Sequence, residues 1–445
     1  MANIRLSPSQ AILLSYAVLI SVGTALFLLL PTTIRSVSPV DALFTVTSAV
    51  TVTGLIVLDT QRDLTFLGQC LLLLLIQIGG LGYMTLTTFL LITLGKRIGL
   101  RERLVLAEAL NYPGVYGLVR FLKRVVVFVL LSEGVGFLLL YLSWIDRFGP
   151  EGALFPALFH SVSAFNNAGF SLFSDNLIPF RGDVATNLIV SALIIVGGIG
   201  FFVINDLYLF LKGKVPRLST HTKLVLTVSS GLIVLGWVGL LMTEAFHRDG
   251  LWSLGWKERI LSTLFFSISS RTAGFNTFDT SLLSESSVFL IMLLMFIGAS
   301  PGSTGGGVKT TNFAVLVLAV LSYIRGRAEA VVFSRSLTQE HVRRAMVVTS
   351  LGFMYIALVN LIIDRVEERD FLSTLFEVVS AFSTVGLSVG NGNGLSFSAE
   401  LSPISKVLIV ITMLVGRVGV LSFAIALIGR ETESRVRHPE ARLLL

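Results

Sequence analysis

The sequence holds little of what soluble and secreted proteins rely on. Only 14% of its 445 residues are charged and 53% are hydrophobic, whereas ordinary soluble domains carry about 25% charged residues. The single cysteine, Cys70, excludes a disulfide framework and argues against redox chemistry. The five histidines are scattered without ligand spacing, so no transition-metal site is expected. Several apolar stretches approach the roughly 20 residues that cross a bilayer, which indicates a polytopic membrane protein.

The net charge of +7 follows topology rather than nucleic acid binding. Lys and Arg cluster in alternate loops and in the tail, whereas Asp and Glu occupy the loops between them. Because positively charged loops stay in the cytoplasm, both termini are predicted to be cytoplasmic. The apolar run at 11–30 is too long for a signal-peptide core, so it is interpreted as a retained first helix.

Four short segments of the chain share one design. Each starts with Phe or Leu, reaches a glycine ten positions later, and continues with Leu or Phe. The glycines, which recur roughly every 105 to 115 residues, are Gly54, Gly169, Gly274 and Gly386. A fourfold-repeated short helix that ends at a glycine, in so hydrophobic a chain, is typical of an ion pore.

The segments organise the chain into four repeats, each a spanning helix, a re-entrant pore helix, an extended stretch with the glycine, and a second spanning helix. This predicts an all-α fold with fourfold pseudosymmetry around one pore, because non-helical backbone at membrane depth must be buried in protein or line water. The eight expected spans are 9–30, 67–95, 120–143, 186–212, 222–245, 287–324, 345–363 and 404–428, and the four pore helices are 41–51, 154–165, 258–270 and 371–382. The repeats are placed at 1–112, 113–215, 216–328 and 329–429, followed by a cytoplasmic tail at 430–445.

The four extended stretches are predicted to bind the ion. A dehydrating K+ needs a ring of backbone carbonyls, and glycine accepts the backbone angles that such a ring imposes. Pore-helix C-termini add partial negative charge. The alternative, that the glycines only permit close helix packing, is disfavoured by four copies in register. The expected filter residues are Thr51, Val52, Thr53, Gly54, Asn166, Asn167, Ala168, Gly169, Arg271, Thr272, Ala273, Gly274, Ser383, Thr384, Val385 and Gly386.

These segments resemble the selectivity-filter loops of the Ktr/Trk/HKT superfamily of potassium transporters, over nearly the whole chain. The resemblance is closest to the membrane subunit of bacterial Ktr uptake systems. It implies a homodimer with one pore per chain, a cytosolic ring of nucleotide- or NAD-type regulatory subunits, and activation by Na+. Each copy keeps one glycine of the two in the Thr-Val-Gly-Tyr-Gly filter of potassium channels, which implies one dominant ion site. A glycine at position 54 favours K+ over Na+ within the superfamily.

Two charged residues, Arg271 and Glu377, lie within the four repeated segments that run from the Phe or Leu to the glycine. Arg271 is expected to brace the filter from behind rather than to contact ions, with Glu377 on the neighbouring pore helix as its suggested partner. Glu377 is likewise interpreted as a filter brace, although acids at membrane depth are candidates for direct function.

A run of glycines interrupts the second long helix of the third repeat. Six of the ten residues at 298–307 are glycine or proline, which no spanning helix sustains. The segment 298–311 is therefore predicted to be an intramembrane gate below the filter, as the resemblance also implies; the alternative is a plain loop between two separate helices. Its residues are Gly298, Ala299, Ser300, Pro301, Gly302, Ser303, Thr304, Gly305, Gly306, Gly307 and Lys309. Val308 precedes Lys309, which spoils the phosphate-binding loop that this run otherwise approaches.

Arg417 lies near the middle of the last predicted span. It is about 11 residues, or some 16 Å at 1.5 Å per residue, from the helix end. Snorkelling over that distance is the alternative to a position in the ion pathway. The resemblance implies that a basic residue here touches the gate and lowers cation occupancy below the filter.

The sequence predicts the K+-translocating subunit of a gated bacterial uptake system in the inner membrane, without a cofactor of its own. The nearest alternative is a Na+- or H+-coupled K+ symporter, for which Glu133, Asp206 and Glu244 are the candidate coupling acids. An integral-membrane enzyme would need a His/Asp/Glu constellation, which the sequence does not offer, and a purely structural subunit would not need four filter-like segments.

Overall fold

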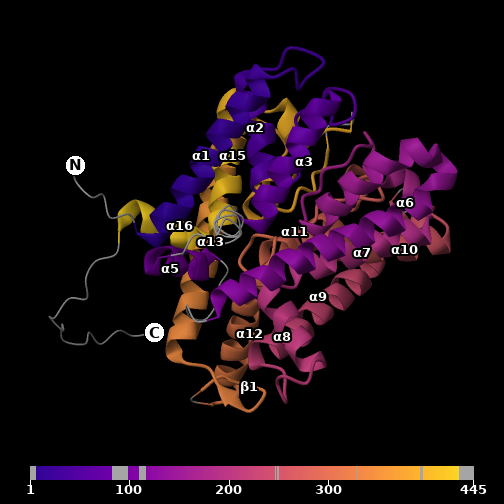
Figure 1. Ribbon diagram of the computed structural model, residues 1–445. Coiled ribbons are helices and arrows are strands. Elements are labelled where there is room, and N and C mark those ends of the chain that lie inside the picture. Colours follow the sequence, from indigo (N-terminus) through magenta and orange to yellow (C-terminus); the bar gives the residue numbers. More distant parts are fainter. Residues whose placement is uncertain are drawn as a thin grey trace.

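A computed structural model describes residues 7–82, 99–109, 117–245, 247, 250–327, 329–390 and 394–429. These residues form a bundle of α-helices with one small hairpin (Figure 1), in which Val331–Val332 (β1) pairs antiparallel with Arg335–Ser336 (β2). The predicted tail at 430–445 lies outside the described residues, as do residues 110–116 around the first predicted repeat boundary.

The helices are grouped by the four predicted repeats, which stay a prediction. The first repeat holds α1 (Pro8–Leu29), α2 (Pro39–Val50) and α3 (Phe66–Leu81), and α5 (Leu100–Ala109) follows. The second holds α6 (Leu118–Phe165), α7 (Val184–Gly198) and α8 (Phe201–Leu211). The third holds α9 (Thr220–Glu244), α10 (Trp256–Ser269), α11 (Glu285–Ile297) and α12 (Thr310–Ile324). The last holds α13 (Gln339–Glu367), α14 (Phe371–Ser383), α15 (Pro403–Val418) and α16 (Val420–Ile428). Short 3-10 turns cover Ile178–Phe180, Leu251–Ser253, Thr280–Leu282 and Phe397–Glu400.

Hydroxyl and carboxylate side chains set where many helices begin. Ser38 accepts a hydrogen bond from the Asp41 amide at the start of α2, and Asp370 accepts one from the Ser373 amide at the start of α14. Such caps satisfy backbone donors that the first helical turn leaves without partners. Similar caps start α1, α3, α7, α9, α11, α13 and α15, at Ser7, Thr65, Asp183, Ser219, Ser284, Thr338 and Ser402.

Length and hydropathy identify part of the expected membrane topology. In the described residues four helices, α1, α6, α9 and α13, are long and apolar enough to cross a bilayer, and the count rises to six if α7–α8 and α15–α16 are each taken as one bent span. The run α6 contains both a predicted span and a predicted pore helix, separated at Gly149, where φ is +73° and the backbone is not helical. The arrangement of eight spans and four pore helices stays a prediction.

The second long helix is interrupted in more repeats than the sequence predicts. We expect single helices over 186–212 and 404–428, but α7 and α8 meet at 97° and α15 and α16 at 102°. The breaks fall at Gly200 and Gly419, whose φ values of +101° and +90° leave the helical region. The expected helix 67–95 ends at Gly82, with φ +78°, and residues 83–98 lie outside the described part of the chain.

Contacts between repeats close them into a ring. Each short helix packs on the second helix of the preceding repeat: α14 on α11, α10 on α7, and α6 on α3. The ring closes because α2 of the first repeat packs on α15 of the last. Figure 1 shows this closure as the indigo start of the chain lying beside its yellow end. The C-terminal ends of α2, α6, α10 and α14, each followed by one of the four glycines, are thereby directed at a common centre.

Candidate functional site

The four glycines meet in a ring at the centre of the molecule. Their φ values are +93° (Gly54), +71° (Gly169), +76° (Gly274) and +89° (Gly386), a region that side chains disfavour. A Cβ on Gly54 would lie 2.5 Å from the Ala168 carbonyl oxygen, and one on Gly169 would lie 2.9 Å from that of Ala273. In the same way, Gly274 faces the carbonyl of Val385, and Gly386 faces that of Thr53. Four carbonyl oxygens and four glycines from four repeats therefore gather in one place.

The residues before each glycine turn their amides away from this ring. The amide of Thr53 donates to the Ser48 carbonyl at 2.8 Å, and that of Val385 donates to Ser380 at 2.9 Å. In the other two repeats the Ala168 amide donates to the Ser163 carbonyl, and the Ala273 amide donates to the Ser269 carbonyl. The residue two before each glycine has a left-handed φ in all four repeats, at Val52, Asn167, Thr272 and Thr384. Because the last turns of α2, α6, α10 and α14 accept these amides, the carbonyls on the opposite side of the strands are free to face the ring.

Four serines that the sequence analysis did not single out fix the strands to their pore helices. The Gly54 amide donates to Ser48 Oγ and the Gly386 amide to Ser380 Oγ, each at 3.0 Å. In the other repeats Ser163 Oγ donates to the Phe170 carbonyl and Ser269 Oγ to that of Phe275. The signal was present in the sequence, since Ser48, Ser163 and Ser380 share the fifth position of their segments and Ser269 takes the sixth.

A cavity of about 200 Å³ opens above the ring and is lined by all four glycines. Three aspartates also line it, Asp59, Asp175 and Asp279, one from each of the first three repeats. Among the described residues that line it there is no Lys or Arg. A cleft lined by one sign of charge raises the local concentration of the opposite ion, so this mouth favours cations.

The glycine-rich segment of the third repeat lies on the other side of the ring. It joins α11 to α12, running from Gly298 to Lys309, and its ends are held together because the Lys309 amide donates to the Ile297 carbonyl at 2.9 Å. A Cβ on Gly305 would collide with Thr272, and one on Gly306 would lie 2.6 Å from Thr384 Oγ1. The segment, here called the gating loop (298–309) after the role that its sequence predicts, thus packs directly under the strands of the third and fourth repeats.

The gating loop is also bonded to the break between α7 and α8. Ser300 donates its amide to the Gly198 carbonyl at 3.1 Å, and Thr304 donates to Gly197 at 3.3 Å. The Phe201 amide donates in return to the Gly302 carbonyl at 2.8 Å. Lys309 turns inward, with Nζ donating to the Gly305 carbonyl at 2.5 Å.

Arg417 ties the gating loop to the first repeat. Its Nη1 donates to the Thr304 carbonyl, and its Nη2 donates to the Gly79 carbonyl at 2.5 Å, at the end of α3. Nε donates to the Tyr16 hydroxyl at 3.2 Å. A planar guanidinium with several fixed donors suits such a multiple contact. The side chain therefore joins α15, α1, α3 and the loop at one point beneath the ring.

The comparisons with known proteins decide the family. A family model described as TrkH, cation transport protein, matches residues 3–434. The chain belongs to the TrkH family of cation transport proteins. The predicted resemblance to the Ktr/Trk/HKT superfamily is thereby confirmed, and the family is one of cation transporters rather than enzymes.

Curated relatives of this TrkH-family chain match it from end to end. It is 38% identical to Ktr system potassium uptake protein B of Bacillus subtilis, over 99% of this chain and 97% of that protein. The protein of the same name from Vibrio alginolyticus is 36% identical, over 98% and 94%. Potassium/sodium uptake protein NtpJ of Enterococcus hirae is 35% identical, over 99% and 98%.

A solved structure shares the fold of this TrkH-family chain. The crystal structure of the potassium transporter TrkH from Vibrio parahaemolyticus superposes with a TM-score of 0.73 at 22% identity. It covers 96% of this chain and 86% of its own chain. The ring geometry described above is thus set in a fold known from a membrane transporter.

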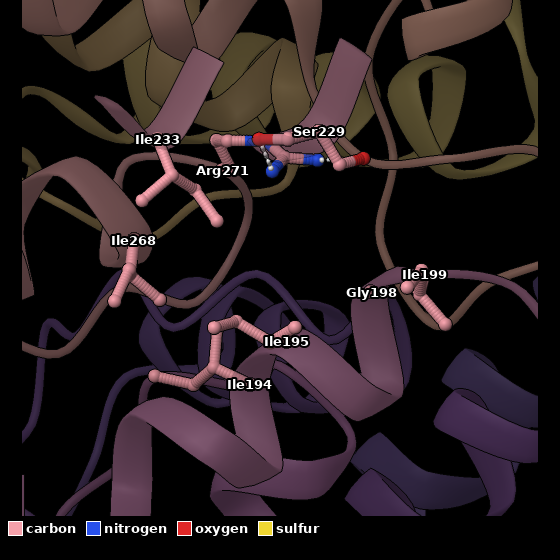
Figure 2. Close-up of a pocket in the computed structure, with 8 residues that line it drawn as sticks. All are labelled: Ile194, Ile195, Gly198, Ile199, Ser229, Ile233, Ile268 and Arg271. Carbon is pink, nitrogen blue, oxygen red and sulfur yellow. Dashed lines mark hydrogen bonds between the residues drawn. The ribbon is translucent and has the colours of Figure 1, made fainter. Parts of the chain in front are cut away.

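Arg271 does not pair with Glu377 as we expected. Its Nη1 donates to the Ser229 carbonyl at 3.1 Å and its Nη2 to Ser229 Oγ at 3.0 Å (Figure 2). The guanidinium thus points away from the ring and toward α9, beside a small cavity lined by Ile194, Ile195, Gly198, Ile199, Ile233 and Ile268. The expected partner was wrong because α10 packs on α9, which brings the Ser229 carbonyl and hydroxyl within hydrogen-bond distance of the guanidinium.

Glu377 contacts its own repeat instead. Its Oε1 accepts hydrogen bonds from the Ser398 amide at 2.9 Å and from Ser398 Oγ at 2.5 Å. Ser398 lies in the 3-10 turn after the fourth filter strand, and Glu377 is 1% exposed. The carboxylate therefore links α14 to the 3-10 turn Phe397–Glu400 of the same predicted repeat.

Proposed function

We propose that this chain is the K+-translocating membrane subunit of a gated bacterial uptake system, and that K+ moves inward through the ring of four glycines. The observation that carries the proposal is the convergence of Gly54, Gly169, Gly274 and Gly386 with four strand carbonyls below an acidic cavity. Carbonyl dipoles that replace a water shell are how proteins admit K+. The names of the Ktr relatives, which are potassium uptake proteins, support the same ion.

The gating loop is the proposed gate. It packs against Thr272 and Thr384 on the inner side of the ring, so an ion that leaves the filter meets it next. Arg417 holds the loop in this position and places a positive charge beneath the filter, which lowers cation occupancy there. Outward displacement of the loop would open the path.

The surroundings of the chain are inferred from charge and from its relatives. Both termini are placed in the cytoplasm and the chain in the bacterial inner membrane, because the alternating loops follow the positive-inside pattern. A homodimer, a cytosolic nucleotide-binding ring and activation by Na+ follow from the superfamily resemblance, and the relatives are named as members of a Ktr system.

A second candidate function is coupled transport of K+ with Na+ or H+ on the same scaffold. It is favoured by one relative, which is named potassium/sodium uptake protein. Two of the three candidate coupling acids already have structural tasks. Asp206 accepts from the Ser219 amide, and Glu244 accepts from the Ser284 and Leu251 amides, so both cap helix ends.

The test of the proposed function is ion flux into proteoliposomes that contain the purified chain. An inward gradient of K+ or its analogue Rb+ should drive uptake, and the same gradient of Na+ should drive much less. Rb+ uptake that also requires an inward Na+ or H+ gradient would favour the symporter. No uptake of any of the three ions would reject the proposal.

A further inference from the structure

Glu133 differs from the other buried acids of the spanning helices. It is 6% exposed in the middle of α6, and no ion pair reaches it in the part of the chain that the structure describes. Asp206 and Glu244 accept backbone amides at helix ends, whereas Glu133 accepts from two side-chain amides. One of these belongs to Asn166, the residue that ends the second pore helix and opens the second filter segment.

Glu133, Gln77 and Asn166 form a closed triangle of hydrogen bonds. Gln77 Nε2 donates to Glu133 Oε2 at 3.1 Å. Asn166 Nδ2 donates to Glu133 Oε1 and to Gln77 Oε1, each at 3.0 Å, and also to the Val162 carbonyl at 2.9 Å. The three side chains come from α6, from α3 of the first repeat, and from the end of the pore helix, so the triangle joins two repeats behind the filter.

With Gln at position 77 and Asn at 166, all three sides of this triangle are satisfied by a carboxylate at position 133 but not by an amide there. Asn166 presents one kind of atom to both neighbours, while an amide at 77 or 133 presents a donor on one side and an acceptor on the other. Suppose that residues 77 and 133 both carry amides. If each of them forms a hydrogen bond with Asn166, then on the side between 77 and 133 either two N–H groups or two oxygens face each other. Two acceptor oxygens at 133 remove this conflict.

The orientation of Asn166 agrees with this rule. Its Oδ1 is buried and has no hydrogen-bond partner among the described residues. Turning the amide over would set that oxygen against Glu133 Oε1 and Gln77 Oε1. The side chain also has no room to move aside, because the Cα of Gly80 packs so closely that an added Cβ would lie 2.8 Å from the Asn166 Cβ. Asn166 is therefore held in one position by charge and by packing.

We propose that Glu133 and Gln77 are positioning residues that hold Asn166, and through it the Asn167–Gly169 strand, in the geometry that discriminates K+ from Na+. This inference rests on the proposed function of the ring. It extends the filter's determinants to two residues outside the four repeated segments. The strand begins one residue after Asn166, and Ala168 and Gly169 both contact neighbouring repeats in the ring.

The test moves the carboxylate from position 133 to position 77 and measures the Rb+/Na+ flux ratio of each single variant and of the double variant. Glu133→Gln leaves one side of the triangle repulsive, and the Rb+/Na+ flux ratio should fall roughly tenfold, the effect of about one buried hydrogen bond. Gln77→Glu sets two carboxylates against each other and should lower the ratio as well. The double variant Glu133→Gln/Gln77→Glu again satisfies all three sides with the same total charge, so it should restore the wild-type ratio.

A matched control separates the triangle from the charge alone. Glu133→Gln/Asn166→Asp keeps the same total charge, but two oxygens face each other on its third side, so it should not restore the ratio. A wild-type Rb+/Na+ ratio in Glu133→Gln would overturn the inference, as would an exchanged variant that fails to assemble or to recover the ratio. Wild-type protein that carries no Rb+ would instead count against the proposed function, which keeps the two failures distinct.

Discussion

Arg417 in α15 donates a hydrogen bond to the carbonyl of Thr304 in the gating loop. The same guanidinium holds the Gly79 carbonyl at the end of α3, so it joins the loop to the first repeat. Charge-assisted hydrogen bonds of this kind are about twice as strong as neutral ones. Removing them should shift the loop toward its displaced position.

Arg417→Gln should therefore raise the rate of Rb+ uptake into proteoliposomes several-fold. Both the bond to Thr304 and the positive charge beneath the filter are lost, and the Rb+/Na+ ratio should stay unchanged because the ring is not altered. Arg369→Gln is the control, since Arg369 pairs with Glu400 at a largely exposed site, where ion pairs contribute little. Unchanged uptake by Arg417→Gln at equal protein density would contradict the role.

Shortening the gating loop should also speed uptake. Deletion of 302–308 removes Thr304 and the glycines that pack under Thr272 and Thr384, so the path below the ring is left open. Rb+ uptake should rise above wild type and stop depending on Arg417, which would show in the double variant. Slower uptake by a well-folded deletion variant would mean that the loop is not a barrier.

A side chain on the ring glycines should damage selectivity. Gly54→Ser places a Cβ at a φ of +93° and against the Ala168 carbonyl, at a conformational cost of about 1–2 kcal/mol before any clash. The Rb+/Na+ flux ratio should fall, and Gly386→Ser should act in the same way. Gly231→Ser in α9 is the control because nothing lies within 4 Å of its added Cβ. Equal Rb+/Na+ flux ratios in Gly54→Ser and Gly231→Ser would show that Gly54 does not contribute to ion selectivity.

Loss of the serine acceptors behind the filter should destabilise the strands. Ser48→Ala leaves the buried Gly54 amide without its partner, which costs about 1–3 kcal/mol. Thermal unfolding in detergent should show a lower Tm, and the stabilisation by added K+ should shrink. Ser21→Ala is a suitable comparison, since Ser21 lies at an exposed site and bonds only to its own helix. If K+ raised the Tm of Ser48→Ala as much as that of the wild type, Ser48 would have no role in shaping the ion site.

The aspartates that line the cavity above the ring should increase the apparent affinity for Rb+ most strongly at low salt. Asp175→Asn removes one of three carboxylates from the cavity above the ring, so the KM for Rb+ uptake should rise at low ionic strength while the maximal rate holds. At about 0.15 M salt the Debye length is about 8 Å, and the difference should narrow. A change that is equally large at both salt concentrations would point to a direct structural effect.

The sequence predicted those features that repeat or that break a pattern. Gly54, Gly169, Gly274 and Gly386 each follow a Phe or Leu by ten positions, and the structure brings the four glycines together. The glycine-rich run was placed at 298–311, and the loop between α11 and α12 spans 298–309. Both signals are local, because glycine and proline in an apolar run disrupt a helix wherever it packs.

Features that depend on tertiary contacts escaped prediction. The breaks at Gly200 and Gly419 lie in apolar runs that hold further glycines, Gly197, Gly198 and Gly416. Because small residues also permit close packing between membrane helices, these glycines alone do not predict a break. The break near Gly200 is bonded to the gating loop, since the Phe201 amide donates to the Gly302 carbonyl. The partner of Arg271 depended on which helix packs behind it. Gln77 and Asn166 lie 89 residues apart, so no local pattern could join them.

The most direct measurement of the central claim is the position of a bound ion. Crystals grown with Rb+ should show an anomalous-scattering peak on the axis enclosed by Gly54, Gly169, Gly274 and Gly386, and replacement of Rb+ by Na+ should abolish it. A Rb+ peak elsewhere in the protein, with none inside this ring, would contradict the account.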